Sequence, residues 1–380
     1  MTILFVTHYA GFYGANKSLY TLMLLLRERH GVEPMVLLPH EGVMCSQLHQ
    51  AGIPYVVHHY YWWMNDNHGL FQWALNKRKQ WRNIFKVAHI VRHLSSRPDI
   101  VYSNSTTINT GFLIAQMLHI PHVWHLRESM SQFGLSLSLS LSLSKRIYRA
   151  PVNKKYILIS DYMMRDYAYL LPHERMVRIY NGVSLPPDVV PRTINEMRDG
   201  VLHVALVGVV SVQKNQLELL KAIALLRQKG VWVHAHLIGG RHSETYYQQL
   251  STFIKENDII NNVTFHGHTN DVFSILREMN LGIVTAKDEA FGRVTIEEML
   301  MRLPVIASDS GANPELVTPG ITGDLYPLGD VETLADKIKQ YMLNPEWLQE
   351  QGTKAYERAV RDFSAESNAE RVWETIHNKR

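Results

Sequence analysis

Short apolar runs alternate with longer stretches of helical periodicity along the whole chain. In the first half the runs cover residues 3–7, 34–38, 55–58, 99–102, 122–124 and 156–159. In the second half they cover residues 202–208, 231–239, 263–268, 281–286 and 304–307. Runs of this length, separated by helical segments, are typical of βαβ units with a parallel sheet covered on both faces. The pattern therefore predicts an α/β protein with two sheets.

A proline-rich stretch separates the two series of runs. The sequence Leu-Pro-Pro-Asp-Val-Val-Pro occupies residues 185–191 and cannot continue regular structure. We therefore expect a first domain at residues 1–184, a linker at 185–199 and a second domain at 200–363. A helical segment at 364–380 is expected to pack back on the first domain.

The composition narrows the class of protein. The 380 residues are 46% hydrophobic and 19% charged, which fits two globular domains. Cys45 is the one cysteine, which excludes an internal disulfide and indicates a reducing compartment. No run approaches the roughly 20 apolar residues of a membrane span, and the amino terminus enters a strand without the features of a leader. We expect a cytoplasmic protein that can lie against a membrane.

The net charge of +4 is unevenly distributed. Residues 1–184 hold 19 Lys and Arg against 9 Asp and Glu, and the remainder holds 20 against 26. A first half with a balance of +10 indicates an anionic surface or acceptor as its partner. Nucleic acid and anionic lipid both satisfy this requirement.

An aromatic and basic segment lies within this basic half. A helix at about residues 71–94 would bring aromatic and basic side chains together at i, i+4 spacing. The residues concerned are Trp73, Lys77, Arg78, Lys79, Trp81 and Arg82. Such a helix suits a lipid headgroup surface, an ordinary packed helix with a solvated face, or stacking on nucleic-acid bases.

The segment from residue 288 to 300, DEAFGRVTIEEML, carries the chemistry on which the other features depend. The periodicity places Glu289 and Gly292 on a turn at the carboxyl end of a strand, and Glu297 on the following helix. Ligands bind at this edge of open α/β sheets, and free N–H groups at a helix start attract anions. Acidic residues near a helix start also complement the macrodipole without any ligand, and Glu297 or Glu298 alone would be explained in that way.

The whole segment resembles the E-x7-E signature of the family-4 retaining glycosyltransferases, with Glu289 and Glu297 at the two signature positions. Residues 304–315 and 320–323 resemble the next segment of that family. The resemblance implies the GT-B fold, in which two doubly wound Rossmann-like domains face a central cleft. It implies that Glu297 holds the ribose hydroxyls and that Glu289 orients the donor sugar. Catalytic roles are thereby assigned to His125 and Glu289.

Further matches extend the resemblance over most of the chain. The loop after the first strand carries Gly14 and resembles the family's glycine-rich loop, although it is not a G-x-G-x-x-G motif. Residues 122–128, HVWHLRE, resemble the strand-end segment whose histidine, here His125, lies beside the departing phosphate. Asn16, Asn104 and Arg127 are candidate acceptor-binding residues, although capping of the next helix is the better explanation for the segment around Asn104.

The second half supplies the expected donor site. Lys214 follows a glycine-ended strand and can neutralise a diphosphate. Relatives usually carry an arginine where this chain has Val209, so Lys214 is expected to be the main cationic contact. The remaining donor-binding candidates are Gly267, His268, Phe291, Gly292, Arg293, Val294 and Thr295. The Leu-Ser repeat at residues 135–144 is expected to be a loop or helix that borders the acceptor site, and expansion of the tract in a tolerant loop is the preferred explanation.

The resemblance implies a retaining, metal-independent hexosyl- or N-acetylhexosaminyltransferase without a cofactor. We expect a UDP-sugar donor and a glycan or lipid-linked glycan acceptor in cell-surface polysaccharide synthesis. The expected surface partner is the anionic inner face of the cytoplasmic membrane. No nucleic acid is expected as a partner. The alternatives are a nucleotide-sugar epimerase on the same fold, and a module that binds membrane or nucleic acid through the basic aromatic helix.

Overall fold

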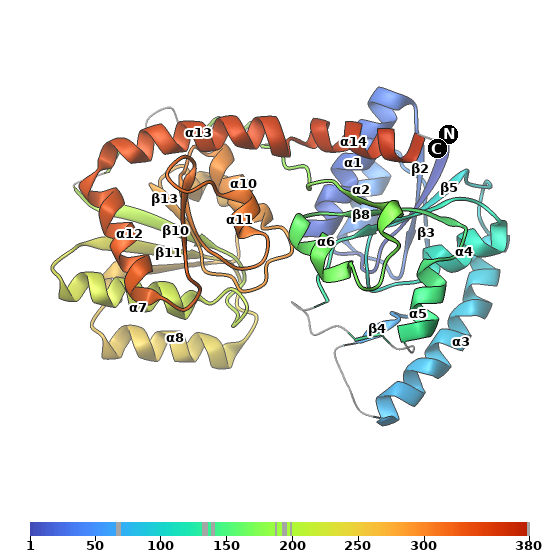
Figure 1. The fold of residues 1–380 in the computed structure, drawn as a ribbon, viewed down its shortest axis with the longest axis horizontal. Helices are drawn as coiled ribbons and strands as arrows, with labels where there is room; N and C mark the ends of the chain where they lie inside the picture. The colour runs from blue at the N-terminus through green and yellow to red at the C-terminus, as the bar shows by residue number, and fades with distance from the viewer. Residues whose placement is uncertain are drawn as a thin grey trace. The chain divides into compact units, whose positions relative to one another are not determined.

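The computed structural model describes residues 1–65, 70–130, 136–137, 141–186, 188–191, 196–197 and 200–377. For residues 65, 70–77, 80, 136–137 and 141 the backbone alone is described. The chain forms two compact units (Figure 1). Unit 1 comprises Met1–Gly182 and Ala365–Arg380, and unit 2 comprises Val183–Ser364.

Unit 1 is built on a parallel sheet with the strand order β3-β2-β1-β5-β6-β8-β9. Its strands are β1 (Thr2–Val6), β2 (Glu33–Leu38), β3 (Tyr55–Val57), β5 (Ile100–Ser103), β6 (His122–Leu126), β8 (Asn153–Leu158) and β9 (Met176–Arg178). The short strands β4 (Met64–Asn65) and β7 (Ser136–Leu137) form a separate antiparallel pair. The strand order reverses between β1 and β5, so the loops that follow these two strands diverge and leave room for a ligand.

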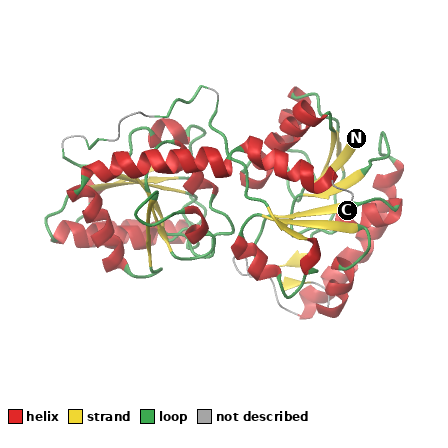
Figure 2. Ribbon diagram, turned by 45° about the horizontal axis from the view of Figure 1, so that its top comes forward, coloured by secondary structure: helices red, strands yellow, loops and turns green. Residues whose placement is uncertain are grey.

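Helices cover both faces of this sheet (Figure 2). The helical elements of unit 1 are α1 (Gly14–His30), α2 (Val43–Gln50), α3 (Leu70–Arg92), α4 (Thr110–Leu118), α5 (Leu141–Tyr148), α6 (Asp161–Tyr167), η1 (His173–Arg175) and α14 (Ala365–His377). Alternate residues of β1 serve the two faces, because successive side chains of a strand point in opposite directions. Ile3 and Phe5 pack in the core formed with α1, α2 and α14, whereas Leu4 and Val6 pack in the core that includes residues of α3 and α4.

Unit 2 repeats this architecture with the strand order β12-β11-β10-β13-β14-β15, all parallel. Its strands are β10 (Leu202–Val207), β11 (Val233–Ile238), β12 (Val263–Gly267), β13 (Leu281–Val284), β14 (Val305–Ser308) and β15 (Gly323–Tyr326). The reversal of order lies between β10 and β13. The loops after these two strands therefore mark the expected ligand position in unit 2.

The helical elements of unit 2 are α7 (Gln216–Gln228), α8 (Glu244–Glu256), η2 (Ile260–Asn262), α9 (Val272–Leu276), α10 (Arg293–Leu300), α11 (Asn313–Leu316), α12 (Val331–Leu343) and α13 (Pro345–Phe363). They cover two hydrophobic cores, one on each face of the sheet. Residues of α7, α8 and α12 pack with Val204 and Leu206, and Leu276 of α9 packs with Ala205 and Ile238.

The predicted α/β architecture with two Rossmann-like sheets is confirmed. The apolar runs in both halves of the chain became strands, and the expected helix at about 71–94 is α3. Four short strands were not predicted. The strands β9 and β15 are only partly buried and neither has a continuous apolar run. The strands β4 and β7 are two residues long each. Among the described residues, no helix combines the length and apolarity needed to cross a bilayer.

Candidate functional site

The two loops at the reversal point of unit 2 are joined by an ion pair. Lys214 follows β10 and Glu289 follows β13, and the Lys214 Nζ atom lies 2.5 Å from Glu289 Oε2. Both side chains keep some exposure, with 26% and 16% of their surface accessible. The pair therefore lies at the edge of the sheet where a ligand can reach it.

The backbone holds Lys214 in place against this partner. The Thr285 hydroxyl donates a hydrogen bond to the Lys214 carbonyl at 2.7 Å, and the Lys287 N–H donates to the Gln213 carbonyl at 3.1 Å. The stem of Lys214 lies directly above Gly208, where a Cβ would approach within 3.2 Å of its side-chain carbons. The loops after β10 and β13 are thus fixed to each other, and the ammonium group is aimed at Glu289.

The Glu289 loop is fixed from a third side by the loop after β14. The Ala312 N–H donates to the Glu289 carbonyl at 2.8 Å, and the Asp288 N–H donates to the Ser310 hydroxyl oxygen at 3.0 Å. Gly311 has a φ of +61° and its Cα faces the backbone of Glu289 so closely that a side chain has no room. Three loops at one edge of the sheet therefore position a single carboxylate.

Glu297 lies on the helix that starts next to this carboxylate. Gly292 precedes α10 with a φ of +87°, and Glu297 Oε1 accepts a hydrogen bond from Arg293 Nε at 2.9 Å. The first turn of α10 has no acidic residue, since Glu297 and Glu298 occupy its fifth and sixth positions. The interpretation of these glutamates as partners of the helix dipole is therefore wrong, because that effect is confined to the first turn.

The two adjacent glutamates have different surroundings. Glu297 is partly exposed, whereas Glu298 is fully buried and its carboxyl lies over Gly282 of β13. Neither carboxyl oxygen of Glu298 has a hydrogen-bond partner in the described part of the chain. Burial raises the pKa of Glu298 well above its usual value, Glu297 raises it further, and Lys214 opposes the change. Glu298 therefore keeps its proton to a higher pH than an exposed glutamate does.

The other donor-binding candidates surround the same edge. Phe291 and Thr295 are buried, Arg293 and Val294 are half-buried, and Gly292 begins the turn into α10. Gly267 ends β12 with a φ of +71°, followed by the exposed His268. The Gly239 N–H donates to the Gly267 carbonyl at 3.0 Å and the Gly208 N–H donates to the Ile238 carbonyl at 2.8 Å, so the ends of β10, β11 and β12 are tied together. Val209, where the resemblance predicts an arginine, is 49% exposed.

In unit 1, the predicted residues lie at the carboxyl ends of β1, β5 and β6: in the last residues of β6, on the following loops and in the first turn of α1. Gly14 is the first residue of α1, and nothing lies within 4 Å of the position that its Cβ would occupy. Asn16 is fully buried: its amide donates to the Tyr9 and Gly11 carbonyls, and its carbonyl accepts from the Thr7 hydroxyl. Asn16 thus shapes the loop after β1 and has no surface of its own to offer to an acceptor.

Asn104 and Arg127 are brought into contact, as neighbouring strand ends require. Arg127 Nε donates to Asn104 Oδ1 at 2.9 Å, and its Nη1 donates to Asn181 Oδ1. The Asn104 amide donates to the Ala15 carbonyl at 3.3 Å. Both side chains are buried, and their hydrogen bonds connect the loops after β1, β5 and β6.

His125 is the last but one residue of β6 and is fully buried. Its Nδ1 atom lies 2.5 Å from the Tyr102 hydroxyl, and its Nε2 atom has no hydrogen-bond partner among the described residues. Burial, assisted by the positive charge of Arg127, lowers the pKa of His125 well below its usual value. His125 is therefore a neutral imidazole with one nitrogen available. Tyr102, which orients it, was missed because a tyrosine inside an apolar strand gives no sign of its partner.

The helix α3 contains the basic aromatic segment. Trp73 and Lys77 lie outside the residues whose side chains are described. Arg78 and Arg82 are exposed and Lys79 is half-buried. Trp81 and Phe85, one turn apart, are 68% and 72% exposed. The observed helix therefore presents large apolar side chains to solvent beside cationic ones. Of the Leu-Ser repeat, the structure describes residues 136–137, which form β7, and residues 141–144, which begin α5.

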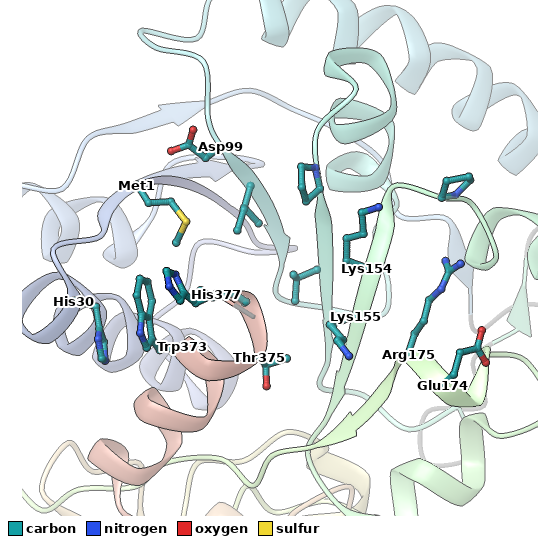
Figure 3. Close-up of a pocket in the computed structure, with 15 residues that line it drawn as sticks. Met1, His30, Asp99, Lys154, Lys155, Glu174, Arg175, Trp373, Thr375 and His377 are labelled. Atoms are coloured by element: carbon teal, nitrogen blue, oxygen red, sulfur yellow. The ribbon is translucent and has the colours of Figure 1, made fainter. Parts of the chain in front are cut away.

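A pocket of about 1010 Å³ lies elsewhere in unit 1, at the amino ends of the strands (Figure 3). Lys154 and Lys155 of β8 line one side of it, and Trp373 lies on the opposite side, stacked between His30 and His377 at centroid distances of 4.4 and 4.6 Å. Because His125 lies at the carboxyl ends of the same strands, this pocket does not belong to the predicted site.

Comparison with known proteins finds sequence similarity between part of the chain and glycosyltransferases. Residues 192–358 match the family model described as "Glycosyl transferases group 1". The capsular polysaccharide biosynthesis glycosyltransferase CapM of Staphylococcus aureus is 27% identical over 177 residues, which cover 46% of this chain and 44% of CapM. The lipopolysaccharide core biosynthesis mannosyltransferase LpcC of Rhizobium leguminosarum bv. viciae is 27% identical over 153 residues, 40% of this chain and 43% of LpcC. The matched segments thus span about two fifths of these relatives.

Solved structures extend the likeness of fold to the whole chain. Anabaena HepE in complex with UDP superposes with a TM-score of 0.80 at 23% identity and covers 99% of this chain and 100% of its own. A sucrose-phosphate synthase from Thermosynechococcus elongatus gives a TM-score of 0.74 at 16% identity, with 99% and 98% covered. The chain therefore has the two-domain GT-B fold, and its residues 192–358 match the glycosyl transferases group 1 model.

Proposed function

We propose that this protein is a retaining glycosyltransferase that moves a hexosyl or N-acetylhexosaminyl group from a UDP-sugar to a hydroxyl of a glycan or lipid-linked glycan. The observation that carries the proposal is the Lys214–Glu289 pair at the reversal point of unit 2, with Glu297 on the adjoining helix. A cation, a carboxylate and a helix start at one strand edge match the diphosphate, the sugar hydroxyls and the ribose of such a donor.

The reaction needs charge stabilisation where the diphosphate departs. The bond between the anomeric carbon and the diphosphate oxygen breaks, and the bond to the acceptor oxygen forms on the same face of the sugar. The acceptor hydroxyl gives its proton to the departing phosphate oxygen. Lys214 and the N–H groups at the start of α10 stabilise the developing negative charge. Glu289 orients the sugar, Glu297 holds the ribose hydroxyls, and no metal or other cofactor is assigned a step.

The choice of UDP rests on structural neighbours, since Anabaena HepE was crystallised with UDP and with UDP-glucose. Two curated relatives are named for capsule and lipopolysaccharide synthesis, which supports a cell-surface glycan as the acceptor class. An epimerase on the same fold would rearrange the free nucleotide sugar and would need no acceptor.

Calorimetry with UDP, UDP-glucose, UDP-N-acetylglucosamine and GDP-mannose tests the donor site directly. We expect UDP-sugars to bind and Glu297→Ala to lose this binding, because the ribose hydroxyls lose their acceptor. Glu350→Ala, an exposed glutamate of α13, is the matched control and should bind as the unaltered protein does. If Glu297→Ala binds the donor and transfers the sugar as well as the unaltered protein does, the assignment of this site is wrong.

We further propose that α3 holds the protein on the anionic inner face of the cytoplasmic membrane. The exposed Trp81 and Phe85 beside Arg78 and Arg82 support this proposal, since interfacial helices combine aromatic and cationic side chains in this way. Binding to vesicles that contain phosphatidylglycerol should fall when Arg78, Lys79 and Arg82 are changed to Gln. Changing Arg146, Arg149 and Lys154 removes the same charge elsewhere on unit 1 and should have less effect. Equal loss in both variants would indicate general charge attraction, and salt-sensitive DNA binding would favour the nucleic-acid alternative.

A further inference from the structure

An aromatic strap crosses the carboxyl edge of the unit 1 sheet at its reversal point. We use the term aromatic strap for residues 60–63, Tyr-Tyr-Trp-Trp. The Tyr60 hydroxyl donates to the Thr7 carbonyl after β1, and Trp63 Nε1 donates to the Thr106 carbonyl after β5 at 2.8 Å. Tyr60 and Trp63 are 2% and 1% exposed, so both ends of the strap are anchored in the core.

Trp62 lies between these two anchors and remains 47% exposed. Its Nε1 donates to the His8 carbonyl at 3.2 Å, and its ring meets the His8 ring edge-on at a centroid distance of 5.4 Å. The indole is thus held in one orientation by the anchored residues on either side of it in the strap and by the hydrogen bond of its own N–H. An exposed apolar plane fixed in this way loses little conformational entropy when a ligand packs on it.

Beneath Trp62, His8 and Glu128 form an incomplete polar pair. His8 Nε2 lies 3.7 Å from Glu128 Oε1, which is too long for a hydrogen bond. Both side chains are nearly buried, at 11% and 12% exposure. Within the described residues His8 has no hydrogen-bond partner at Nδ1, whereas Glu128 accepts from the Ser105 hydroxyl at 3.1 Å and the Thr106 N–H at 2.7 Å.

A hydroxyl group fits the chemistry of this gap. It can donate to the carboxylate and accept from an imidazole N–H at the same time, which neither an apolar group nor a cation can do. Burial lowers the pKa of His8, and the nearby Glu128 only partly opposes this, so the imidazole is neutral and carries one N–H. An apolar plane beside paired donor and acceptor groups is the combination that orients small polar ligands with an apolar face.

We infer that Trp62, with His8 and Glu128, forms the subsite for a sugar ring of the acceptor: the C–H face of the ring packs on the indole, and one of its hydroxyls bridges the imidazole and the carboxylate. The inference rests on the proposed transferase function for its role, but the subsite binds saccharide by itself. It favours a neutral pyranose over a lipid surface, because the polar groups described at this position are the His8 imidazole and the Glu128 carboxylate, which suit a hydroxyl.

Saturation-transfer NMR with a panel of methyl glycosides tests the subsite without a donor. The probes are the methyl glycosides of glucose, galactose, mannose and N-acetylglucosamine, and the disaccharides lactose and maltose. We expect at least one probe to bind, Trp62→Ala to weaken it at least tenfold, and Trp62→Phe to retain most of the binding. Trp81→Ala removes a more exposed indole from the same unit and should leave saccharide binding unchanged.

His8→Phe separates the polar part of the subsite from the apolar part. It keeps a ring under Trp62 but has no nitrogen to bridge, so we expect loss of saccharide binding with an unchanged unfolding midpoint. Unaltered binding in Trp62→Ala, or the absence of binding by every probe to the unaltered protein, overturns the inference. Loss of vesicle binding in Trp62→Ala with saccharide binding retained would assign the indole to a membrane surface instead.

Failure of the acceptor subsite can be distinguished from failure of the proposed transferase function. If UDP-sugars do not bind but the glycosides bind through Trp62, the subsite stands and the transferase proposal fails. If transfer is observed, Trp62→Ala should raise KM for the acceptor at least tenfold and leave KM for the UDP-sugar unchanged. An unchanged KM for the acceptor would show that the acceptor lies elsewhere.

Discussion

The buried carboxyl of Glu298 makes the stability of unit 2 depend on pH in an unusual direction. Glu298 is fully buried on α10, and neither of its oxygens has a hydrogen-bond partner among the described residues. Burial and the nearby Glu297 raise its pKa well above the ordinary value near 4.5. The folded protein therefore keeps a proton that the unfolded chain releases, and stability falls as pH rises from about 4.5 toward the pKa of the folded carboxyl.

The magnitude follows from this difference in bound protons. Each pH unit in that range lowers the free energy of unfolding by about 1.4 kcal/mol, since one proton is bound in the folded state alone. Replacing Glu298 by Met keeps the length of the side chain and removes the ionisable group. We therefore expect Glu298→Met to be more stable than the unaltered protein at pH 7.5, with a difference that shrinks toward pH 5.

Urea unfolding at half-unit steps between pH 5 and pH 8 measures the difference, and hydrogen exchange of peptides from α10 and β13 localises it to unit 2. Glu350→Gln, an exposed glutamate, is the control and should not alter the slope. Parallel pH dependences for Glu298→Met and the unaltered protein would refute the reasoning, because the carboxyl would then titrate alike in both states.

Two further predictions concern charges in unit 2. Lys214→Met removes the cation beside Glu289 and should weaken UDP binding roughly tenfold to a hundredfold by calorimetry, as expected for a charge-assisted contact; Lys221→Met, on the exposed side of α7, should bind UDP normally. His236 has its pKa lowered to about 3, by burial and then by the neighbouring histidines, so it stays neutral in the fold while the unfolded chain takes up a proton below about pH 6.5. The free energy of unfolding should therefore fall as pH drops from 6.5 to 4.5. His236→Gln should reduce that loss by about 1 kcal/mol, a value lowered to allow for the partial exposure of the side chain. If thermal or urea unfolding shows the same loss in His236→Gln and in the unaltered protein, the assignment is wrong.

Much of the fold could be predicted from the sequence because buried parallel strands are continuous apolar runs. The strands of both sheets and the positions of Lys214 and Glu289 at strand ends follow from these runs. Their contact across 75 residues of sequence could be expected only after the order of strands was known, since it depends on β10 and β13 being neighbours.

The surroundings of individual polar residues could not be predicted in the same way. Glu297 and Glu298 are adjacent and identical in sequence, yet one is partly exposed and the other buried, because α10 is buried around most of its circumference. Asn16, Asn104 and Arg127 were chosen as acceptor contacts, but hydrogen bonds to neighbouring loops occupy them. The sequence shows that a residue is polar and lies near a strand end, and does not show which group it already binds. The roles assigned to His125, Glu289 and the other site residues stay predictions.

The helix α14 has a consequence for the order in which the chain folds during synthesis. Ala369, Val372 and Ile376 belong to the core that also contains Ile3 and Phe5 of β1. Unit 2, residues 183–364, leaves the ribosome before these residues do. Part of one hydrophobic core of unit 1 therefore stays exposed to solvent while unit 2 is synthesised. A chaperone that shields apolar surface would be needed most by the first half of this chain, and truncation before residue 365 should expose the same surface permanently.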